Sequence, residues 1–279
     1  MVRTPQQKRT RRATGACCAC ARGRGMSLKV PSMQQNTTRT VHISRTMMLT
    51  EAITLFQAVP KRADLNTCRQ AIVEDNLLLK RTVSNREKTF RFLRELYALD
   101  PDDTVYGALR TLWDGDPLAR PILALLNAAY RDEVLRPSAA AILAARPGAV
   151  VTKQELAATI DVAYPKRFGE KSLDKVSRNV ASTWTQSGHL TGRVAKKRAQ
   201  VKPTVGAAAF ALLLGWLEGQ RGLSLFETLW AKVIGDNGAD LDTLAFAASN
   251  RDWLRFKRLG DVVEIDFTAF LAGLEVPRG

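Results

Sequence analysis

The sequence has few of the residues on which metal centres and most catalytic centres depend. It holds two histidines and four cysteines in 279 residues, and Cys17, Cys18 and Cys20 crowd together near its start. Zinc sites space their ligands as Cys-x2-Cys or wider and need about four of them. The histidines, His42 and His189, lie far apart, and neither pairs with a recognisable nucleophile. The sequence therefore predicts no metal site, no cofactor and no catalytic residue.

Sequence motifs of the common enzyme classes and of membrane spans are missing as well. There is no G-x-x-x-x-G-K phosphate loop and no His-Glu-x-x-His zinc motif. The longest charge-free run, residues 203–217, has 15 residues, whereas a membrane-spanning helix needs about 20. The lack of an apolar h-region and the few cysteines exclude a disulfide-built secreted fold. We expect a cytoplasmic, non-enzymatic protein without a membrane span.

Acidic residues are also few relative to basic ones, and the imbalance differs from one part of the chain to another. The 42 Lys and Arg outnumber 27 Asp and Glu, for a formal net charge of +15. Residues 1–33 contribute +8 and residues 153–203 contribute +7, while residues 204–279 carry −3. An excess of this size predicts a polyanionic partner, either nucleic acid or an anionic membrane surface.

The chain divides into a tail and three folded parts. Residues 1–40 are rich in Arg, Thr, Gly and Ala and lack an apolar period, so we interpret them as a disordered basic tail. Additional phosphate contacts are the alternative role for this tail. The rest predicts a mainly α fold: a helical N-terminal domain at 41–147, a winged helix-turn-helix at 148–204, and a second winged-helix-like unit at 205–279, with short β-hairpins.

Apolar residues at helical spacing place the elements of the N-terminal domain. They predict helices over residues 46–58, 65–80, 84–98, 104–113, 117–131 and 137–145. Ser84 and Glu87, three positions apart, form a capping-box pattern at the start of the third helix. The charged side of that helix is interpreted as a solvated face, with a phosphate-contacting face as the alternative.

Residues 152–203 carry the most informative pattern. Thr152 and Glu155 form a second capping box at the start of one helix. After a break at Pro165, a second helix is expected over residues 172–187, followed by a short strand, a basic loop and a returning strand. This is the order of a winged helix-turn-helix, in which the second helix enters the major groove and the hairpin, or wing, contacts phosphates.

The predicted DNA-binding residues follow from this arrangement. The second helix has an apolar stripe that includes Val176, Val180 and Trp184, and its polar side chains lie opposite. The candidates are these outward residues and the cations of the wing and its flank: Lys171, Lys175, Arg178, Asn179, Ser182, Arg193, Lys196, Lys197, Arg198 and Lys202. His189 is expected to pack against the hairpin rather than to act as a ligand or base.

Residues 205–279 repeat this plan with the opposite net charge. A buried apolar helix is expected over residues 205–217, and Asp240 is expected to cap a later helix. Residues 253–258 and 262–267 alternate in polarity around a Gly-Asp turn, which predicts a second hairpin. The negative charge favours packing or partner binding over DNA contact for this unit.

Double-stranded DNA is the favoured partner, and an RNA-binding or protein-scaffolding winged-helix module is the alternative. Few exposed aromatic residues are expected among the basic ones, whereas single-strand recognition uses aromatic stacking. An enzyme is the least favoured class because no phosphate loop, zinc motif or metal cluster appears, and it stays open only because a constellation of carboxylates would leave no sequence motif.

Six blocks of sequence carry a family resemblance: residues 74–86 (EDNLLLKRTVSNR), 92–97 (FLRELY), 116–120 (DPLAR), 171–180 (KSLDKVSRNV), 187–190 (SGHL) and the hairpin at 254–267. In this order they resemble BrxA-type proteins, small subunits of BREX bacteriophage-exclusion systems, over roughly residues 45–271. The resemblance implies a helical, non-enzymatic, DNA-binding accessory protein of antiviral defence, with other BREX components as candidate partners. It carries over no catalytic motif.

Overall fold

The structure, a computed structural model, describes residues 40–235 and 240–275. Helices dominate this part of the chain, accompanied by two small antiparallel hairpins. The expectation of a mainly α fold with short hairpins is therefore confirmed. The expected basic tail, apart from its last residue Thr40, lies outside the described residues.

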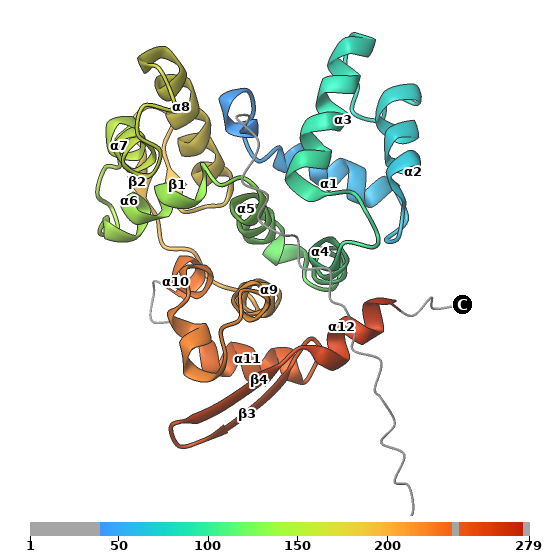
Figure 1. Cartoon of the computed structure of the whole chain (residues 1–279), viewed down its shortest axis with the longest axis vertical. Coiled ribbons are helices and arrows are strands. Elements are labelled where there is room, and N and C mark those ends of the chain that lie inside the picture. The colour runs from blue at the N-terminus through green and yellow to red at the C-terminus, as the bar shows by residue number, and fades with distance from the viewer. Residues whose placement is uncertain (1–39, 236–239, 276–279) are drawn as a thin grey trace, which may run out of the picture.

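The N-terminal part is a set of helices that pack around two central ones. In chain order the helices are α1 (Leu49–Ala58), α2 (Leu65–Arg69), α3 (Val83–Tyr97), α4 (Thr104–Gly115), α5 (Arg120–Arg131) and α6 (Ala139–Ala144). Short segments connect or precede them: the 3-10 turns η1 (Val41–Ile43), η3 (Pro117–Ala119) and η4 (Arg136–Ser138), and the π-helical turn η2 (Gln70–Glu74). Figure 1 shows α4 and α5 crossing the middle of the molecule, with α1 to α3 above them on one side.

Two details of this part differ from the sequence-based expectation. The helix expected over residues 65–80 ends at Glu74, because Asn76 and Leu79 adopt left-handed backbone angles, φ 51° and 50°, which no α-helix accommodates. The next helix, α3, begins at Val83, and its N-cap is Thr82, whose hydroxyl oxygen accepts the amide of Asn85 at 3.2 Å. The predicted capping box of Ser84 and Glu87 is therefore wrong.

The middle segment contains α7 (Lys153–Ala163), α8 (Glu170–Gln186), β1 (Leu190–Thr191) and β2 (Lys197–Arg198). Thr152 and Glu155 form the expected capping box before α7. Gly188 follows α8 with φ +85°, the left-handed angle that suits glycine at a helix end. β2 pairs on one side with β1 and on the other with Val150, which precedes α7. The hairpin thus closes back on the start of the segment.

The C-terminal segment lies beneath the two central helices (Figure 1). Its elements are α9 (Val205–Leu217), the 3-10 segment η5 (Gly222–Glu227), α10 (Leu229–Gly235), α11 (Leu241–Ser249), β3 (Arg255–Leu259), β4 (Val262–Asp266) and α12 (Thr268–Glu275). The expected helix over 205–217 is confirmed, and the second hairpin turns at Gly260-Asp261 as expected. The Asp240 carboxylate caps α11 by accepting the amide of Asp242 at 3.0 Å.

One connected apolar core runs through all of these segments. α9 is apolar on every side, which fits its position, because α4, α5, α10 and α11 all pack against it. The core therefore crosses both boundaries that the sequence predicts, at 147/148 and 204/205, and the division into units stays a prediction. None of the described helices combines the length and the apolar character that crossing a membrane requires.

Candidate nucleic-acid interface

The helix expected to enter the DNA groove, α8, is held by one buried stripe. Val176 and Val180 are fully buried, and Trp184 is 1% exposed. The indole nitrogen of Trp184 donates a hydrogen bond to the hydroxyl of Ser138 at 2.8 Å, so its polar atom is satisfied inside the core. The stripe expected from the sequence is confirmed, and it fixes which face of α8 points outward.

The outward face of α8 carries a row of cations. Lys171, Lys175 and Arg178, spaced by four and three positions, are all exposed. Asp174 lies beside them and accepts the Lys153 ammonium at 2.5 Å and the Arg178 guanidinium at 3.0 Å. The hydrogen bond from Lys153, with the charges of Lys153 and Arg178, lowers the pKa of Asp174. This carboxylate stays ionised and ties α7 to α8, while Lys171 and Lys175 keep their heads in solvent.

The loop between β1 and β2 presents further cations. Arg193 and Lys197 are exposed, while Lys196 is half-buried and donates through its ammonium to the Gly192 carbonyl at 2.8 Å. Gly192 has φ +96°, and a Cβ there would stand 2.2 Å from the Ala195 carbonyl oxygen, so the tight loop requires glycine. The loop is thus a narrow basic turn.

Arg198 does not belong to this exposed set, although the sequence places it on the wing. It is 2% exposed, and its guanidinium donates to the carbonyls of Ile142, His189 and Ala199. The returning strand begins at Lys197, so Arg198 lies within the strand and not in the basic loop, and side chains alternate along a strand. Lys197 therefore points outward and Arg198 points into the core. The expectation that Arg198 is an exposed wing residue is wrong.

The remaining candidates are divided between internal contacts and solvent. The side-chain amide of Asn179 donates to the His42 carbonyl at 2.7 Å, and the hydroxyl of Ser182 donates to the Arg178 carbonyl at 3.0 Å. Lys202, in the segment that follows β2, is exposed. The structure thus leaves six of the ten candidates in the exposed class: Lys171, Lys175, Arg178, Arg193, Lys197 and Lys202.

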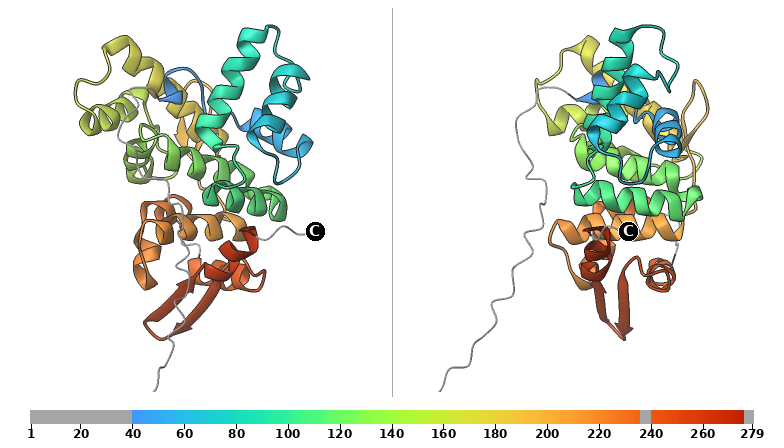
Figure 2. Two further views of the ribbon diagram at one scale, coloured as in Figure 1. Left: turned by 45° about the vertical axis from the view of Figure 1, so that its right-hand side comes forward. Right: turned by 90° about the vertical axis from the view of Figure 1, so that its right-hand side faces the viewer.

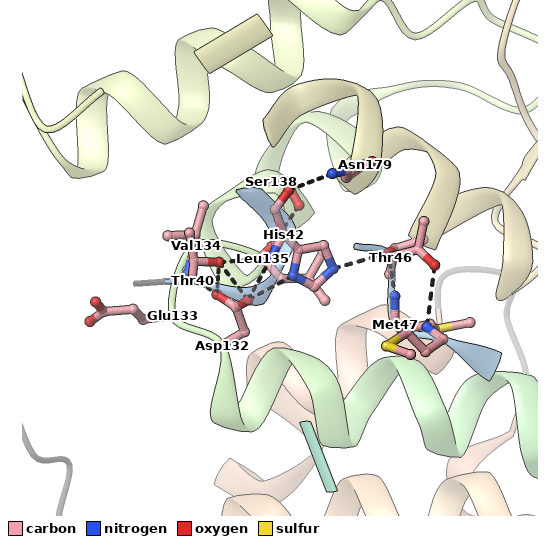
Figure 3. Close-up of polar contacts among 12 residues, drawn as sticks. Thr40, His42, Thr46, Met47, Asp132, Glu133, Val134, Leu135, Ser138 and Asn179 are labelled. Carbon is pink, nitrogen blue, oxygen red and sulfur yellow. Dashed lines mark hydrogen bonds and ion pairs between the residues drawn. The ribbon is translucent and has the colours of Figure 1, made fainter. Parts of the chain in front are cut away.

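A buried polar cluster beneath α8 was not expected from the sequence (Figure 3). The Asp132 carboxylate accepts the Thr40 hydroxyl at 2.5 Å, a ring nitrogen of His42 at 2.7 Å and the Val134 amide at 3.1 Å. Burial alone raises the pKa of Asp132, but the charge and hydrogen bond of His42, with the bonds from Thr40 and Val134, hold it below its usual value. We call Thr40, His42, Asp132 and Thr183 the N-terminal clamp.

The clamp fastens the first described residues to α8. The other ring nitrogen of His42 lies 3.0 Å from the Thr183 hydroxyl on α8, and the same hydroxyl accepts the Met47 amide at 3.0 Å. The Tyr97 hydroxyl in turn donates to the Met47 carbonyl at 2.7 Å. Residues 40–47 therefore pass between α8 and α3, and they bond to both. Figure 1 shows this segment, in blue, between the two helices.

The order Asp132, His42, Thr183 resembles a carboxylate–imidazole–hydroxyl triad, yet its surroundings do not suit catalysis. His42 and Thr183 are each 0% exposed, and no substrate reaches a hydroxyl that is closed off in this way. The Thr183 oxygen is already engaged by the Met47 amide. The cluster therefore acts as a structural clamp.

The sequence offered little that could have revealed the clamp. Two of its bonded members, His42 and Thr183, are 141 positions apart. Pairing across such a distance depends on tertiary packing and leaves no spacing motif. The weak signal available was that His42 follows Thr40 in a segment without acidic residues, where a histidine has no local partner.

Two further titratable side chains, His189 and Cys68, are buried. The ring nitrogens of His189 lie 2.9 Å from the Ser187 hydroxyl and 3.0 Å from the Val233 carbonyl of α10, so both are engaged inside the core. Burial raises the pKa of the Cys68 thiol to about 11, which keeps it protonated at neutral pH. Among residues 40–235 and 240–275, no three His, Cys, Asp or Glu side chains are grouped so as to hold a metal ion.

Comparisons with known proteins do not extend this description. No protein-family model matches the chain. No curated protein is significantly similar to it in sequence.

Proposed function

We propose that residues 148–204 form a winged helix that binds double-stranded DNA. Its elements would be α7, α8 and the β1–β2 hairpin, with the Val150 segment as the third strand. The order helix, helix, strand, strand, with a strand segment before the first helix, supports this proposal because it is the order in which winged helices present a recognition helix and a wing.

The observation that carries the proposal is the exposed row of Lys171, Lys175 and Arg178 opposite the buried stripe of α8. A helix in a major groove needs one face against its own domain and the other free to reach base edges. The row meets this requirement over about two helical turns. The acidic neighbour Asp174 is occupied by Lys153 and Arg178, so its charge is compensated locally.

We assign different roles to the helix and the wing. Lys175 and Arg178 would lie in the groove and contact bases, since they are exposed on the face of α8 opposite the buried stripe. Arg193 and Lys197 would contact phosphates, which position a protein on the duplex without reading its sequence. Residues 189–203 contain no acidic side chain, so the wing would approach the backbone without local repulsion.

A titration with labelled duplex DNA at several salt concentrations tests the proposal. Each neutralised phosphate releases condensed counterions, so log K should fall against log salt with a slope of about −0.9 per contact. A structured RNA of equal length is the matched competitor, and it should displace the duplex poorly. Absence of duplex binding at low salt, or preference for RNA, contradicts the proposal.

A protein-scaffolding role is the second candidate, and one observation favours it. Val194, at the tip of the wing, is 94% exposed. An apolar tip fits a protein surface better than a phosphate backbone. The variant Val194→Ser separates the two roles, because it should leave duplex binding unchanged if the wing contacts DNA through Arg193 and Lys197.

We further propose that this DNA binding serves antiviral defence, as the resemblance to BrxA-type proteins implies. Deletion of the gene in its host, followed by phage challenge, tests this part. Unchanged phage sensitivity, with wild-type duplex binding by the purified protein, would separate the DNA-binding proposal from the defence proposal. The observation that supports the defence role is the ordered set of sequence blocks between residues 74 and 267.

A further inference from the structure

A second concentration of positive charge lies on α3 and on the three residues before it. Residues 80–97 contain six Lys and Arg and two acids, which gives this stretch a formal charge of +4. Residues 170–186, which form α8, contain three basic and two acidic residues, for a charge of +1. Figure 2 shows α3 and α8 at the same end of the molecule, opposite the β3–β4 hairpin. The function proposed for α8 leaves this more basic helix unexplained.

Part of the charge on α3 is not balanced by neighbouring acids. The Glu87 carboxylate is already engaged by the Arg69 guanidinium at 2.5 Å. Lys88 and Arg94 are exposed, and neither is paired with a carboxylate of residues 40–235 and 240–275. These two cations are therefore available to an anion that comes from outside the chain.

The exposed cations of α3 belong to one row along the helix. The row consists of exposed polar residues spaced by four, three and three positions: Ser84, Lys88, Arg91 and Arg94. A hollow of about 540 Å³ lies along this row, and its lining includes all four residues. Arg91 is paired with Glu95 at 3.7 Å, but both side chains are about half exposed, so solvent screens the pair. We call these four residues the α3 row.

The α3 row points away from α8. The opposite side of α3 faces residues 40–47, because the Arg45 guanidinium lies 3.5 Å from the Asn85 side-chain oxygen and 5.6 Å from the centre of the Phe92 ring. Residues 40–47 in turn bond to α8 through Thr183. Arg94 follows Asn85 by nine positions, which is about half a turn around the helix axis. A duplex held by α8 is therefore separated from the α3 row by α3 itself.

Internal contacts fix the direction in which the α3 row points. The Arg86 guanidinium donates to the carbonyls of Val73 at 3.1 Å and Lys80 at 3.4 Å, which ties the loop before α3 to the helix. On the buried side, Leu93 and Leu96 are 0% exposed. A helix held in this way cannot turn about its axis, so its cations form a fixed surface rather than a set of mobile side chains.

The chemistry of the α3 row fits the phosphate backbone of a duplex. Lysine, arginine and serine side chains are the usual donors to phosphate oxygens. Proteins that bind single strands add aromatic rings on which bases stack, whereas the ring that lines this hollow, Phe90, is 8% exposed. The row extends over about 15 Å, a length in which a duplex presents about nine phosphate charges.

We propose that the α3 row is a second surface for double-stranded DNA, which contacts phosphates without reading bases. One molecule then holds two duplex segments at once, one on α8 and its wing and the other on α3. The second surface is argued from the charge and geometry of α3 alone, and only the joining of two duplexes rests on the function proposed for α8.

Neutralised variants test the α3 surface by itself. The background is the full-length protein with four DNA-facing cations replaced by Ala: Lys175, Arg178, Arg193 and Lys197. It should still bind labelled duplex in a salt-dependent way. Adding Lys88→Ala and Arg94→Ala should lower the salt slope by about 0.9 for each lost phosphate contact. Lys232→Ala with Arg251→Ala removes two exposed cations of the C-terminal segment and should leave the slope unchanged. Equal slopes for the two pairs, with unchanged circular dichroism, overturn the proposal.

A two-duplex capture assay tests the joining. Beads that carry a biotinylated duplex and full-length protein should retain a second, fluorescein-labelled duplex. The variant Lys88→Ala with Arg94→Ala should bind the first duplex but lose the second. Retention of the second duplex by this variant, or its displacement by the same sequence as a single strand, contradicts the proposal. Binding of one duplex only by wild type also contradicts it and leaves the function of α8 intact, whereas no duplex binding at all contradicts both.

Discussion

The two hairpins of this protein carry similar numbers of cations but differ in where the balancing acids lie. The β1–β2 hairpin presents Arg193, Lys196 and Lys197, and residues 189–203 contain no acid at all. In the β3–β4 hairpin, Lys257 lies opposite Glu264 and Arg255 lies opposite Asp266. The position of the countercharge therefore decides what each hairpin can approach. An uncompensated basic loop suits a polyanion, whereas a basic strand balanced by neighbouring acids does not.

The hairpins also differ in how they are fixed to the molecule. The first is anchored at its root by the buried Arg198, and the helix before it is tied to residues 40–47 by the N-terminal clamp. The second projects from the lower end, where η5 covers one edge and α11 flanks the other (Figure 1). The first arrangement holds a surface at a fixed angle, as groove reading requires. In the second, α11 bonds to the β3 side through Ser249 and Asp242, while η5 packs on β4.

The largest loss of folding stability is expected from breaking the N-terminal clamp, which ties α8 to residues 40–47. Asp132→Ala should lower the free energy of unfolding by about 3–5 kcal/mol, because it leaves buried partners unpaired. Urea unfolding followed by circular dichroism measures it. The control is Asp174→Ala, which removes a half-buried carboxylate with surface ion pairs and should lose much less stability than Asp132→Ala. A small loss for Asp132→Ala would mean that α8 is positioned without the clamp.

The same carboxylate gives the clamp a pH dependence with a defined sign. The pKa of Asp132 is held below the ordinary value of 3.8, so the folded state favours the ionised form. The stabilisation is present above the unfolded pKa and is lost as the pH falls through the lower folded value. The difference in stability between wild type and Asp132→Ala should therefore be constant near neutral pH and shrink below about pH 4.

A second comparison concerns one arginine from each hairpin. Arg198→Ala should cost about 2–3 kcal/mol, since three buried carbonyls lose a donor. Arg258 has a partly exposed side chain paired with Asp242, and its loss should cost at most about 1 kcal/mol. Thermal unfolding of the two variants side by side tests the contrast. Equal losses would show that Arg198 and Arg258 contribute equally to fixing their hairpins.

Next comes the outward face of α8. Lys175→Ala with Arg178→Ala should weaken binding to a preferred duplex by about 1–3 kcal/mol per lost base contact and should flatten any sequence preference. Binding to preferred and scrambled duplexes, with circular dichroism as the folding control, measures both effects. Wild-type binding by the folded variant would place the DNA contact elsewhere.

The sequence predicted elements better than it predicted contacts. The α8 stripe and the Gly260-Asp261 turn follow from local spacing and turn chemistry, and both are confirmed. Arg198 was misplaced because the returning strand begins at Lys197, so Arg198 lies in the strand with its side chain inward and not in the exposed loop before it. The clamp between His42, Asp132 and Thr183 was missed because it joins three distant segments. Helix α12 went unexpected, although it packs on α4.

The smallest effect on stability, and the sharpest test of the contrast between the hairpins, comes from removing exposed cations. Replacing Arg193, Lys196 and Lys197 by Ala should weaken binding to every duplex alike and lower the salt slope by about one per lost phosphate contact. Replacing Arg255 and Lys257 by Ala should leave duplex binding and its salt slope unchanged, because Asp266 and Glu264 already balance these cations. Both sets are exposed or half-buried, so unfolding should shift by no more than about 0.5 kcal/mol per residue. The assay is duplex binding at a series of salt concentrations, with both variants matched to wild type in circular dichroism. If the two variants lose the same slope, the position of the countercharge does not decide between the hairpins, and a polyanion contacts both.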